Sequence, residues 1–159
     1  MRDQETILYH GSQTIVELPE IRPSRFYKDF HLGFYCTLLF KQAKRWAIRF
    51  SGQGKISEYL YRPDSSLQIL KFPEMTEEWL DFVVSCRTGV PHFYDIVEGP
   101  MADDTIFNYV QNFVDGKISR SAFWELVKFK HPTHQICFHT PLSLTKLQFL
   151  KGYSVTDEE

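Results

Sequence analysis

The chain has 159 residues, of which 43% are hydrophobic and 16% aromatic. This length supports one well-buried core and is short for two ordinary domains, so we expect a single domain. Eighteen basic and twenty acidic side chains give a net charge of −2, so the chain as a whole offers no electrostatic attraction to nucleic acid. No stretch reaches the roughly 18 apolar residues of a membrane span, and the opening residues lack the apolar run of a signal peptide. These features predict a cytoplasmic protein with no membrane partner.

Neither the cysteines nor the histidines have the spacing of a metal site. The three cysteines are widely separated and form no Cys-x-x-Cys pair, so we expect reduced thiols that act as small apolar residues. They are Cys36, Cys86 and Cys137. Near the C-terminus lie His131, His134 and His139, of which the last two are an odd number of residues apart and would point to opposite faces of a strand. We therefore predict surface or rim roles for these histidines and no bound metal.

Apolar runs bounded by glycine predict two early strands, Ile7 to His10 and Phe34 to Thr37. The second strand runs into a helix whose apolar side chains recur with the 3.6-residue period of a single stripe. They are Leu39, Ala43, Trp46, Ala47 and Phe50. Two further strands, Ile56 to Tyr61 and Leu67 to Phe72, flank a turn at residues 62–65. Together these two strands suggest a hairpin.

The second half of the chain alternates between helices and strands. Three helices have recognisable start or stop signals. They run from Thr76 to just before Gly89, from Asp103 or Asp104 to Gly116, and from Ser119 onward. The predicted strands are Phe93 to Val97, Gln135 to His139 and Leu147 to Tyr153. Residues 98–102 are predicted to form a loop, and the last two strands are candidate partners of each other.

These elements predict one α+β domain over residues 1–155, with six or seven short strands and four helices. Residues 156–159 form a short acidic segment that we expect to fray. The three tryptophans, Trp46, Trp79 and Trp124, each lie on a helical apolar stripe. We therefore expect them to anchor the core.

Three short segments end predicted strands with polar or aromatic groups that an apolar core does not require. They are Leu8-Tyr9-His10-Gly11-Ser12, Gly33-Phe34-Tyr35-Cys36-Thr37 and His134-Gln135-Ile136-Cys137-Phe138-His139. In order and character they resemble the three signature strands of the ADP-ribosyltransferase superfamily, in its histidine–tyrosine–acid branch. Further pieces, among them Gln42-Ala43-x-x-Trp46-Ala47 and the stretch from Tyr94 to Asp104, resemble an uncharacterised bacterial group of that superfamily. The resemblance covers nearly the whole chain and implies the split β-sheet core of that superfamily.

The resemblance implies a nucleotide-handling triad of His10, Tyr35 and Gln135, with NAD⁺ as the substrate. His10 is then expected to hydrogen-bond the adenosine-side ribose, and Tyr35 to lie against the nicotinamide ring. The residues implied to contact NAD⁺ are His10, Gly11, Ser12, Arg25, Asp29, Gly33, Phe34, Tyr35 and Thr37. Breaking the nicotinamide–ribose bond leaves an oxocarbenium-like sugar, so a site that fixes a strained conformation lowers the barrier without a covalent intermediate.

Two positions depart from the pattern of the superfamily. Gln135 stands where better-known relatives carry glutamate, and its amide can hydrogen-bond the ribose but cannot act as a general base or carry compensating charge. Glu98, Asp103 and Asp104 are therefore candidates to supply a carboxylate on the acceptor side. His31 stands where a glycine is expected and is predicted to narrow the loop before the second strand.

Each of these residues also has a purely structural interpretation, which the sequence leaves open. His10 before Gly-Ser is typical of a turn, and Tyr35 in an aromatic strand is typical of a core. Asp103 and Asp104 are typical of a helix cap. The charged pair at positions 25 and 29 can be an ordinary exposed ion pair, worth about 0 to 1 kcal/mol.

The resemblance implies an NAD-dependent ADP-ribosyltransferase that modifies a macromolecule without a metal. It further implies a bacterial toxin or phage-defence effector, held in check by a neutralising antitoxin protein. Two alternatives stay open: an NAD glycohydrolase with water as the acceptor, and an NAD-binding or catalytically inactive interaction module that keeps the fold. The residues do not specify whether the acceptor is a protein, a nucleic acid or a small molecule.

Overall fold

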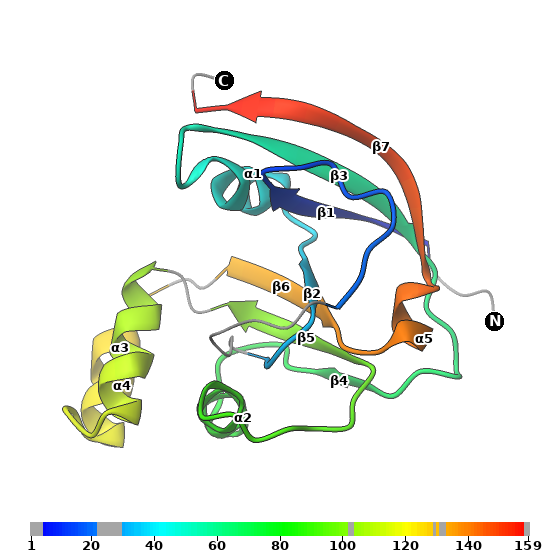
Figure 1. Cartoon of the computed structure of the whole chain (residues 1–159). Coiled ribbons are helices and arrows are strands. Elements are labelled where there is room, and N and C mark those ends of the chain that lie inside the picture. Colours follow the sequence, from blue (N-terminus) through cyan, green and yellow to red (C-terminus); the bar gives the residue numbers. More distant parts are fainter. Residues whose placement is uncertain (1–4, 22–29, 102–103, 129, 131–132, 158–159) are drawn as a thin grey trace.

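The computed structural model of the chain describes residues 5–21, 30–101, 104–128, 130 and 133–157 (Figure 1). These residues form a single α+β domain with seven strands and five helices. In chain order they are β1 (Thr6–Ser12), β2 (Phe34–Cys36), α1 (Phe40–Ile48), β3 (Gln53–Tyr61), β4 (Ile69–Lys71), α2 (Glu77–Arg87), β5 (Ile96–Met101), α3 (Asp104–Val114), α4 (Arg120–Val127), β6 (Thr133–Phe138), α5 (Pro141–Leu144) and β7 (Leu147–Thr156). None of these five helices is long and apolar enough to cross a membrane.

The strands form two sheets, which we call sheet A and sheet B. In sheet A, β3 lies between β1 and β7, and both pairs are antiparallel. Sheet B has the order β2-β6-β5-β4, in which β4 and β5 run parallel and the other pairs antiparallel. Figure 1 shows the two sheets as separate layers, with α1 beneath sheet A and α2 to α4 beside sheet B.

The expected hairpin over residues 56–72 is wrong, because its two strands belong to different sheets. β3 lies in sheet A, whereas β4 pairs with β5 in sheet B. Parallel strands need a long crossover, and α2 provides it between β4 and β5. The segment that follows β3 is bonded to Lys146, which directly precedes β7. Arg62 N donates to Lys146 O at 3.0 Å, and Lys146 Nζ lies 2.6 Å from Asp64 Oδ2.

The last two strands do not pair with each other, which corrects a second expectation. β6 lies in sheet B, and β7 pairs along its length with β3 in sheet A. Helix α5, which the sequence analysis missed, redirects the chain between the two sheets (Figure 1). Thr140 caps this helix by accepting a hydrogen bond from Ser143 N at 3.2 Å, and Pro141 occupies its first turn. Because β7 extends to Thr156, the expected frayed segment does not begin at that residue.

Strand β5 is placed later in the chain than expected and continues through a Gly-Pro pair. It begins at Ile96 rather than Phe93, whose side chain is 94% exposed. Residues 98–101, predicted as a loop, belong to the strand and pair with β6. β4 ends opposite Glu98, so Pro100 lies where β5 has a strand neighbour on one side only. A proline is tolerated there because no second ladder needs its missing N–H.

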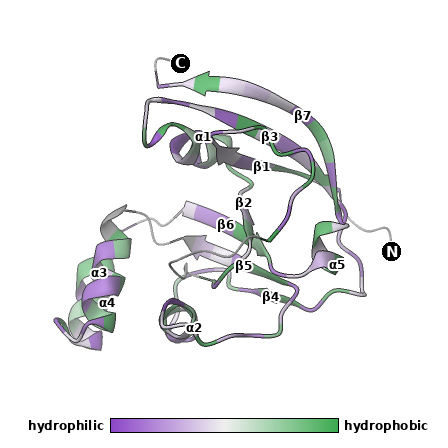
Figure 2. Ribbon diagram, viewed as in Figure 1, coloured by the Kyte–Doolittle hydropathy of each residue, from purple (hydrophilic) through white to green (hydrophobic). Residues whose placement is uncertain are grey.

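Three apolar clusters hold the layers together. The first lies between sheet B and helices α2 to α4, and the second lies between the two sheets. The third joins α1 to sheet A through Ala43, Ala47, Ile56 and Val155. Figure 2 shows that α3 and α4 carry both hydrophobic and hydrophilic bands, as expected for helices that turn one face to a core.

The tryptophans and cysteines contribute to this interior as expected. Trp79 is fully buried and donates Nε1 to Pro100 O at 3.0 Å. Trp46 and Trp124 are partly buried and pack against the same cluster. All three cysteines are buried and none of them forms a disulfide, so the prediction of reduced apolar thiols agrees with their surroundings.

Helix α1 lies directly on sheet A because two glycines leave room for its backbone. A Cβ atom on Gly11 would lie 1.9 Å from Ala43 O, and one on Gly54 would lie 2.1 Å from Ala47 O. These two glycines therefore set the distance between the helix and the sheet. The helix ends at Ile48, so Phe50, which we expected on its buried stripe, is 79% exposed.

Candidate functional site

The first strand of sheet A meets the first strand of sheet B at an isolated bridge between Tyr9 and Thr37. Each residue donates its backbone N–H to the carbonyl of the other at 2.9 Å. Next to the bridge, His10 Nδ1 lies 2.6 Å from Tyr35 O, and the imidazole stacks on the ring of Phe34 with centroids 4.2 Å apart. A carbonyl only accepts, so Nδ1 carries a proton. The ring of His10 thus has a fixed orientation at the junction of the two sheets.

The predicted third residue, Gln135, comes to the same junction through sheet B. β2 pairs with β6 in the register Tyr35 with Cys137 and Cys36 with Ile136. Side chains alternate along a strand, so Gln135 lies on the same face of β6 as Cys137. Gln135 is 4% exposed. The three predicted residues therefore come from three neighbouring strands, β1, β2 and β6, but not from one face. Tyr35 and Gln135 lie on the face of sheet B that packs against α2 to α4, whereas His10 stacks on Phe34 at the opposite face.

The phenol of Tyr35 is embedded in the core of sheet B. Its side chain is 7% exposed and belongs to the same apolar cluster as Phe30 and Trp79. Its hydroxyl accepts a hydrogen bond from Phe30 N at 3.0 Å and donates one to His31 O at 2.6 Å. His31 has a φ of 77°, the left-handed region in which a glycine is usual, and this explains why a glycine was expected there. Tyr35 thus fixes the turn that leads into its own strand.

Several other residues expected to contact NAD⁺ have structural roles in the described chain. Ser12 Oγ donates to Thr14 O at 2.6 Å, and the space beside Gly11 is filled by α1. A Cβ atom on Gly33 would lie 2.4 Å from Cys137 Sγ. Neighbouring atoms of the chain leave no room for a Cβ at either position, which explains why both residues are glycine without invoking a ligand.

Five of the predicted residues can be assessed only in part or not at all. Arg25, Asp29 and Asp103 lie outside the described residues, as does His131. Asp104 is the first residue of α3, in agreement with the predicted helix start.

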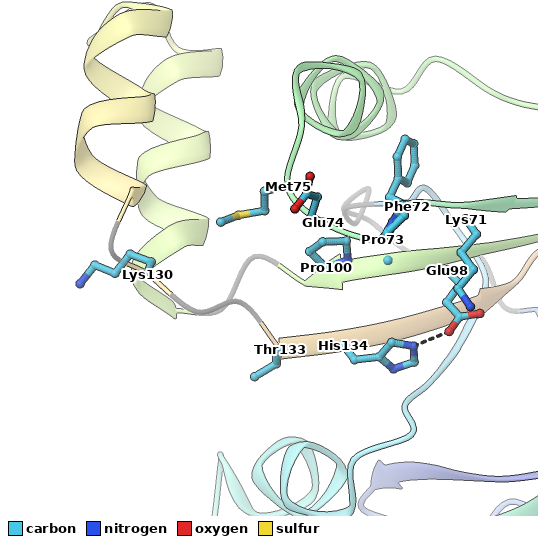
Figure 3. Close-up of a pocket in the computed structure, with 11 residues that line it drawn as sticks. Lys71, Phe72, Pro73, Glu74, Met75, Glu98, Pro100, Lys130, Thr133 and His134 are labelled. Atoms are coloured by element: carbon cyan, nitrogen blue, oxygen red, sulfur yellow. Dashed lines mark hydrogen bonds and ion pairs between the residues drawn. The ribbon is translucent and has the colours of Figure 1, made fainter.

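Glu98, a predicted acceptor-side carboxylate, forms a pair with His134 at the edge of this junction (Figure 3). Glu98 Oε2 lies 2.8 Å from His134 Nε2, and the two side chains are only 16% and 20% exposed. Leu38 N donates to His134 Nδ1 at 3.2 Å, so Nδ1 carries no proton and Nε2 donates to the carboxylate. Burial raises the pKa of Glu98, but the hydrogen bond from His134 and the charge of Lys71 outweigh that effect, so the pKa is lowered overall. Glu98 is therefore ionised at neutral pH.

Two other histidines, which the sequence analysis did not assign to a site, clamp the turn before β2. His92 Nδ1 accepts from Tyr94 N at 3.1 Å, so Nε2 donates to Phe30 O at 3.1 Å. His139 Nδ1 donates to Leu32 O at 2.8 Å, and its Nε2 is buried without a hydrogen-bond partner among the described residues. The two rings are perpendicular, with centroids 4.3 Å apart. The rim position predicted for His139 agrees with its intermediate exposure, but the sequence analysis missed its bond to Leu32 O.

This clamp predicts a loss of stability in mild acid. Burial lowers the pKa of His139 to about 4, helped by the charges of His92 and His31 and opposed by its bond to Leu32 O. Below a pH of about 6.5, His139 is protonated in the unfolded chain but stays neutral in the folded chain. The free energy of unfolding is therefore highest above that pH and decreases toward pH 4. We expect a loss of about 3 kcal/mol from this group, measured by urea unfolding across that range.

His139→Asn is the control for this titration, because an amide can still donate to Leu32 O and does not titrate. The variant should show a flatter dependence of unfolding free energy on pH. An unchanged slope would mean that other groups cause the acid sensitivity.

A family model of proteins of unknown function, DUF3990, matches residues 6–149 of the chain. No curated protein matches the sequence. The matched segment begins with β1 and ends within β7, so it includes both sheets and the junction between them. The chain therefore belongs to the DUF3990 family.

Proposed function

We propose that this protein binds NAD⁺ and transfers its ADP-ribose unit to an acceptor, as an NAD-dependent ADP-ribosyltransferase. The observation that carries the proposal is the junction of β1, β2 and β6. His10, Tyr35 and Gln135, which are far apart in sequence, come from neighbouring strands there. The resemblance to ADP-ribosyltransferases implied that these residues lie close together, and their neighbouring strands and the two-sheet core are compatible with that expectation.

A polar group with unmet hydrogen-bonding capacity near the junction supports a ligand. Gln42 lies on α1 beside Ala43, the residue whose carbonyl faces Gly11, and is 3% exposed. Its Oε1 is buried without a hydrogen-bond partner among the described residues. A buried acceptor without a donor costs about 1 to 3 kcal/mol. The amide and hydroxyl groups of NAD⁺ are donors of the kind that would satisfy it.

The proposed reaction needs positioning more than a nucleophile on the protein. The bond between nicotinamide and the ribose C1″ breaks, and nicotinamide leaves with the electron pair as a neutral molecule. The positive charge left on the sugar is quenched by the acceptor, which forms the new bond to C1″. In this proposal, the amide of Gln135 orients the ribose by hydrogen bonding and supplies no charge.

The test is incubation of the purified protein with a cell lysate and NAD⁺ labelled in its adenine. We expect label in macromolecules together with release of nicotinamide. Free ADP-ribose as the sole product would identify a glycohydrolase instead. If neither product forms, and saturating NAD⁺ causes no thermal shift, the proposed function is wrong; at 100 times its dissociation constant a ligand adds about 2.7 kcal/mol of stability.

Gln135→Glu tests the role of the amide. A carboxylate there would stabilise the positive charge of the breaking sugar bond, so we expect nicotinamide release to increase on the order of tenfold. Gln148→Glu makes the same chemical change at an exposed position of β7, in sheet A, and should leave release unchanged. An identical rate in the Gln135 variant and the wild type would place Gln135 away from the reacting sugar.

A further inference from the structure

A pocket of about 480 Å³ lies at the place in sheet B where β4 ends and β5 continues (Figure 3). Four of its lining residues share one face of the sheet, because Lys71 is the register partner of Glu98, and Pro100 is the register partner of His134. Tyr35 and Gln135 lie on the opposite face of sheet B and do not line the pocket. The pocket is therefore a separate site from these two residues.

The charge inside the pocket is the carboxylate of Glu98. This side chain is only 16% exposed, and its lowered pKa keeps it ionised at neutral pH. The other charged side chains of the described lining are exposed, so water and salt screen them. They are Lys71, Glu74 and Lys130. The pocket therefore favours a positively charged group over an anion.

Glu98 keeps hydrogen-bonding capacity that the described residues do not use. A carboxylate can accept about four hydrogen bonds, and the chain supplies one, from His134 Nε2 to Glu98 Oε2 at 2.8 Å. The imidazole is held at its other end, where Leu38 N donates to Nδ1 at 3.2 Å, so the carboxylate has a fixed position. A protonated primary amine brings three donors and a full positive charge, which together match a carboxylate of this kind.

Much of the remaining lining is apolar and offers no polar group to a ligand. Pro100 has no backbone N–H, and its carbonyl already accepts from Trp79 Nε1 at 3.0 Å. The apolar side chains of the lining are Phe72, Pro73, Met75 and Pro100. Walls of this kind suit the methylene groups of an aliphatic chain.

We propose that this pocket binds a primary ammonium group on a short aliphatic chain, with the ammonium at Glu98 and the chain against the apolar wall. Two sources carry this chemistry, namely a free alkylamine and the lysine side chain of a peptide. His134 is a positioning residue that orients the carboxylate. The proposal does not rest on the proposed function, because it involves neither NAD⁺ nor Gln135.

The test is a titration of the purified protein with n-butylamine near neutral pH, followed by NMR of its backbone amides. We expect saturable shifts at pocket residues such as Lys71 and Gly99. 1-Butanol and butyrate carry chains of similar length without a positive charge and should bind about tenfold or more weakly. Equal binding of 1-butanol, or no saturable shift with n-butylamine, would overturn the proposal.

Nα-acetyl-lysine amide distinguishes the two sources of the ammonium group. Tighter binding of this probe than of n-butylamine would indicate a peptide as the ligand, and the reverse order would indicate a free amine. Either order supports the assignment of the pocket to an ammonium group.

Glu98→Gln removes the charge of the carboxylate and keeps its shape. The affinity for n-butylamine should fall about tenfold or more, whereas the affinity for 1-butanol should not change. Glu74→Gln is the matched control, because it makes the same change at an exposed position of the lining and should have little effect. An equal loss in the two variants would mean that general surface charge attracts the amine, and would overturn the assignment to Glu98.

The positioning role of His134 is read from the pH dependence of n-butylamine binding. The other titratable groups that act on Glu98 are Lys71 and Tyr61. Burial, with the charge of Glu98 as a smaller cause, raises the pKa of Tyr61, so its phenol stays neutral. His134 and Lys71 lower the pKa of Glu98, so binding should be present at neutral pH and lost in acid, as Glu98 is protonated.

In His134→Ala the pKa of Glu98 rises, so the loss of binding should begin at a higher pH than in the wild type. His134→Gln retains an N–H donor and should return the profile toward the wild-type position. An unmoved profile in His134→Ala would overturn the positioning role. Wild-type binding that persists unchanged in acid would overturn the assignment of the ammonium to Glu98, even where Glu98→Gln fails to fold.

These titrations contain no NAD⁺, so their outcomes are separate from those of the proposed function. A protein that binds n-butylamine through Glu98 but neither binds nor cleaves NAD⁺ would leave the pocket assignment standing and the proposed function wrong. A protein that cleaves NAD⁺ but binds no amine would show the reverse.

Discussion

Gly11→Ala should leave little folded protein, although it adds a single methyl group. The new Cβ would lie 1.9 Å from Ala43 O, 2.8 Å from Ala43 C and 3.0 Å from Ala47 N. All three are backbone atoms of α1, so no side chain can rotate away to relieve the overlap. The helix must separate from sheet A, and we expect a cost of more than about 4 kcal/mol, measured as a lowered midpoint of urea unfolding by circular dichroism.

Gly116→Ala is the matched control, because this glycine has a φ of 75° and no atom within 4 Å of its would-be Cβ. Its cost is conformational and should be about 1 kcal/mol. Similar destabilisation by the two substitutions would mean that α1 and sheet A are not in close contact. In that case the room beside Gly11 would be available to a ligand, as the sequence analysis expected.

Tyr35→Ala is the second substitution with a large expected effect. It removes a 7% exposed ring from the core of sheet B and the two hydrogen bonds that hold residues 30 and 31. We expect a loss of about 3 to 5 kcal/mol in unfolding free energy. The measurement is chemical denaturation, followed by NAD⁺ binding on the folded fraction.

Tyr35→Phe separates the ring of Tyr35 from its hydroxyl. The variant keeps the ring and leaves Phe30 N and His31 O without their partner, so it should cost about 1 to 2 kcal/mol. A ring that contacts nicotinamide should do so equally well in this variant. If Tyr35→Ala were instead as stable as the wild type and lost only NAD⁺ affinity, Tyr35 would be a ligand contact without a role in the core.

Local signals in the sequence predicted most of the helices and the first strands. Thr76 accepts from Trp79 N and Ser119 from Ala122 N, as their cap positions indicated. Gly116 follows α3 with a positive φ, as expected for a helix stop. These signals work because capping and glycine conformation depend on the few residues around them.

Strand pairing was not predictable in the same way. The turn at residues 62–65 suggested a hairpin, but the contacts of Lys146 with Arg62 and Asp64 join that turn to a segment more than eighty residues later. Pro100 suggested a loop because the sequence cannot show that β4 ends before reaching it. Both errors arise because pairing depends on which strands meet, which a local pattern does not contain.

The sequence predicted the strands that carry the candidate site residues better than the contacts that these residues make. The order of the segments containing His10, Tyr35 and Gln135 indicated strands that the structure places side by side. The pair of Glu98 and His134 was missed because His134 was considered only with its neighbours in sequence. Its partner lies 36 residues away on β5, and only the β5–β6 register brings the two together.

The bridge between Tyr9 and Thr37 has a mechanical consequence. Among the described strand residues and their immediate neighbours, it is the one backbone link that joins sheet A to sheet B. A small tilt of one sheet against the other would therefore pivot about two peptide groups while both ladders stay intact. His10, one residue from that pivot, would move least, and groups farther out along β6 would sweep a wider arc.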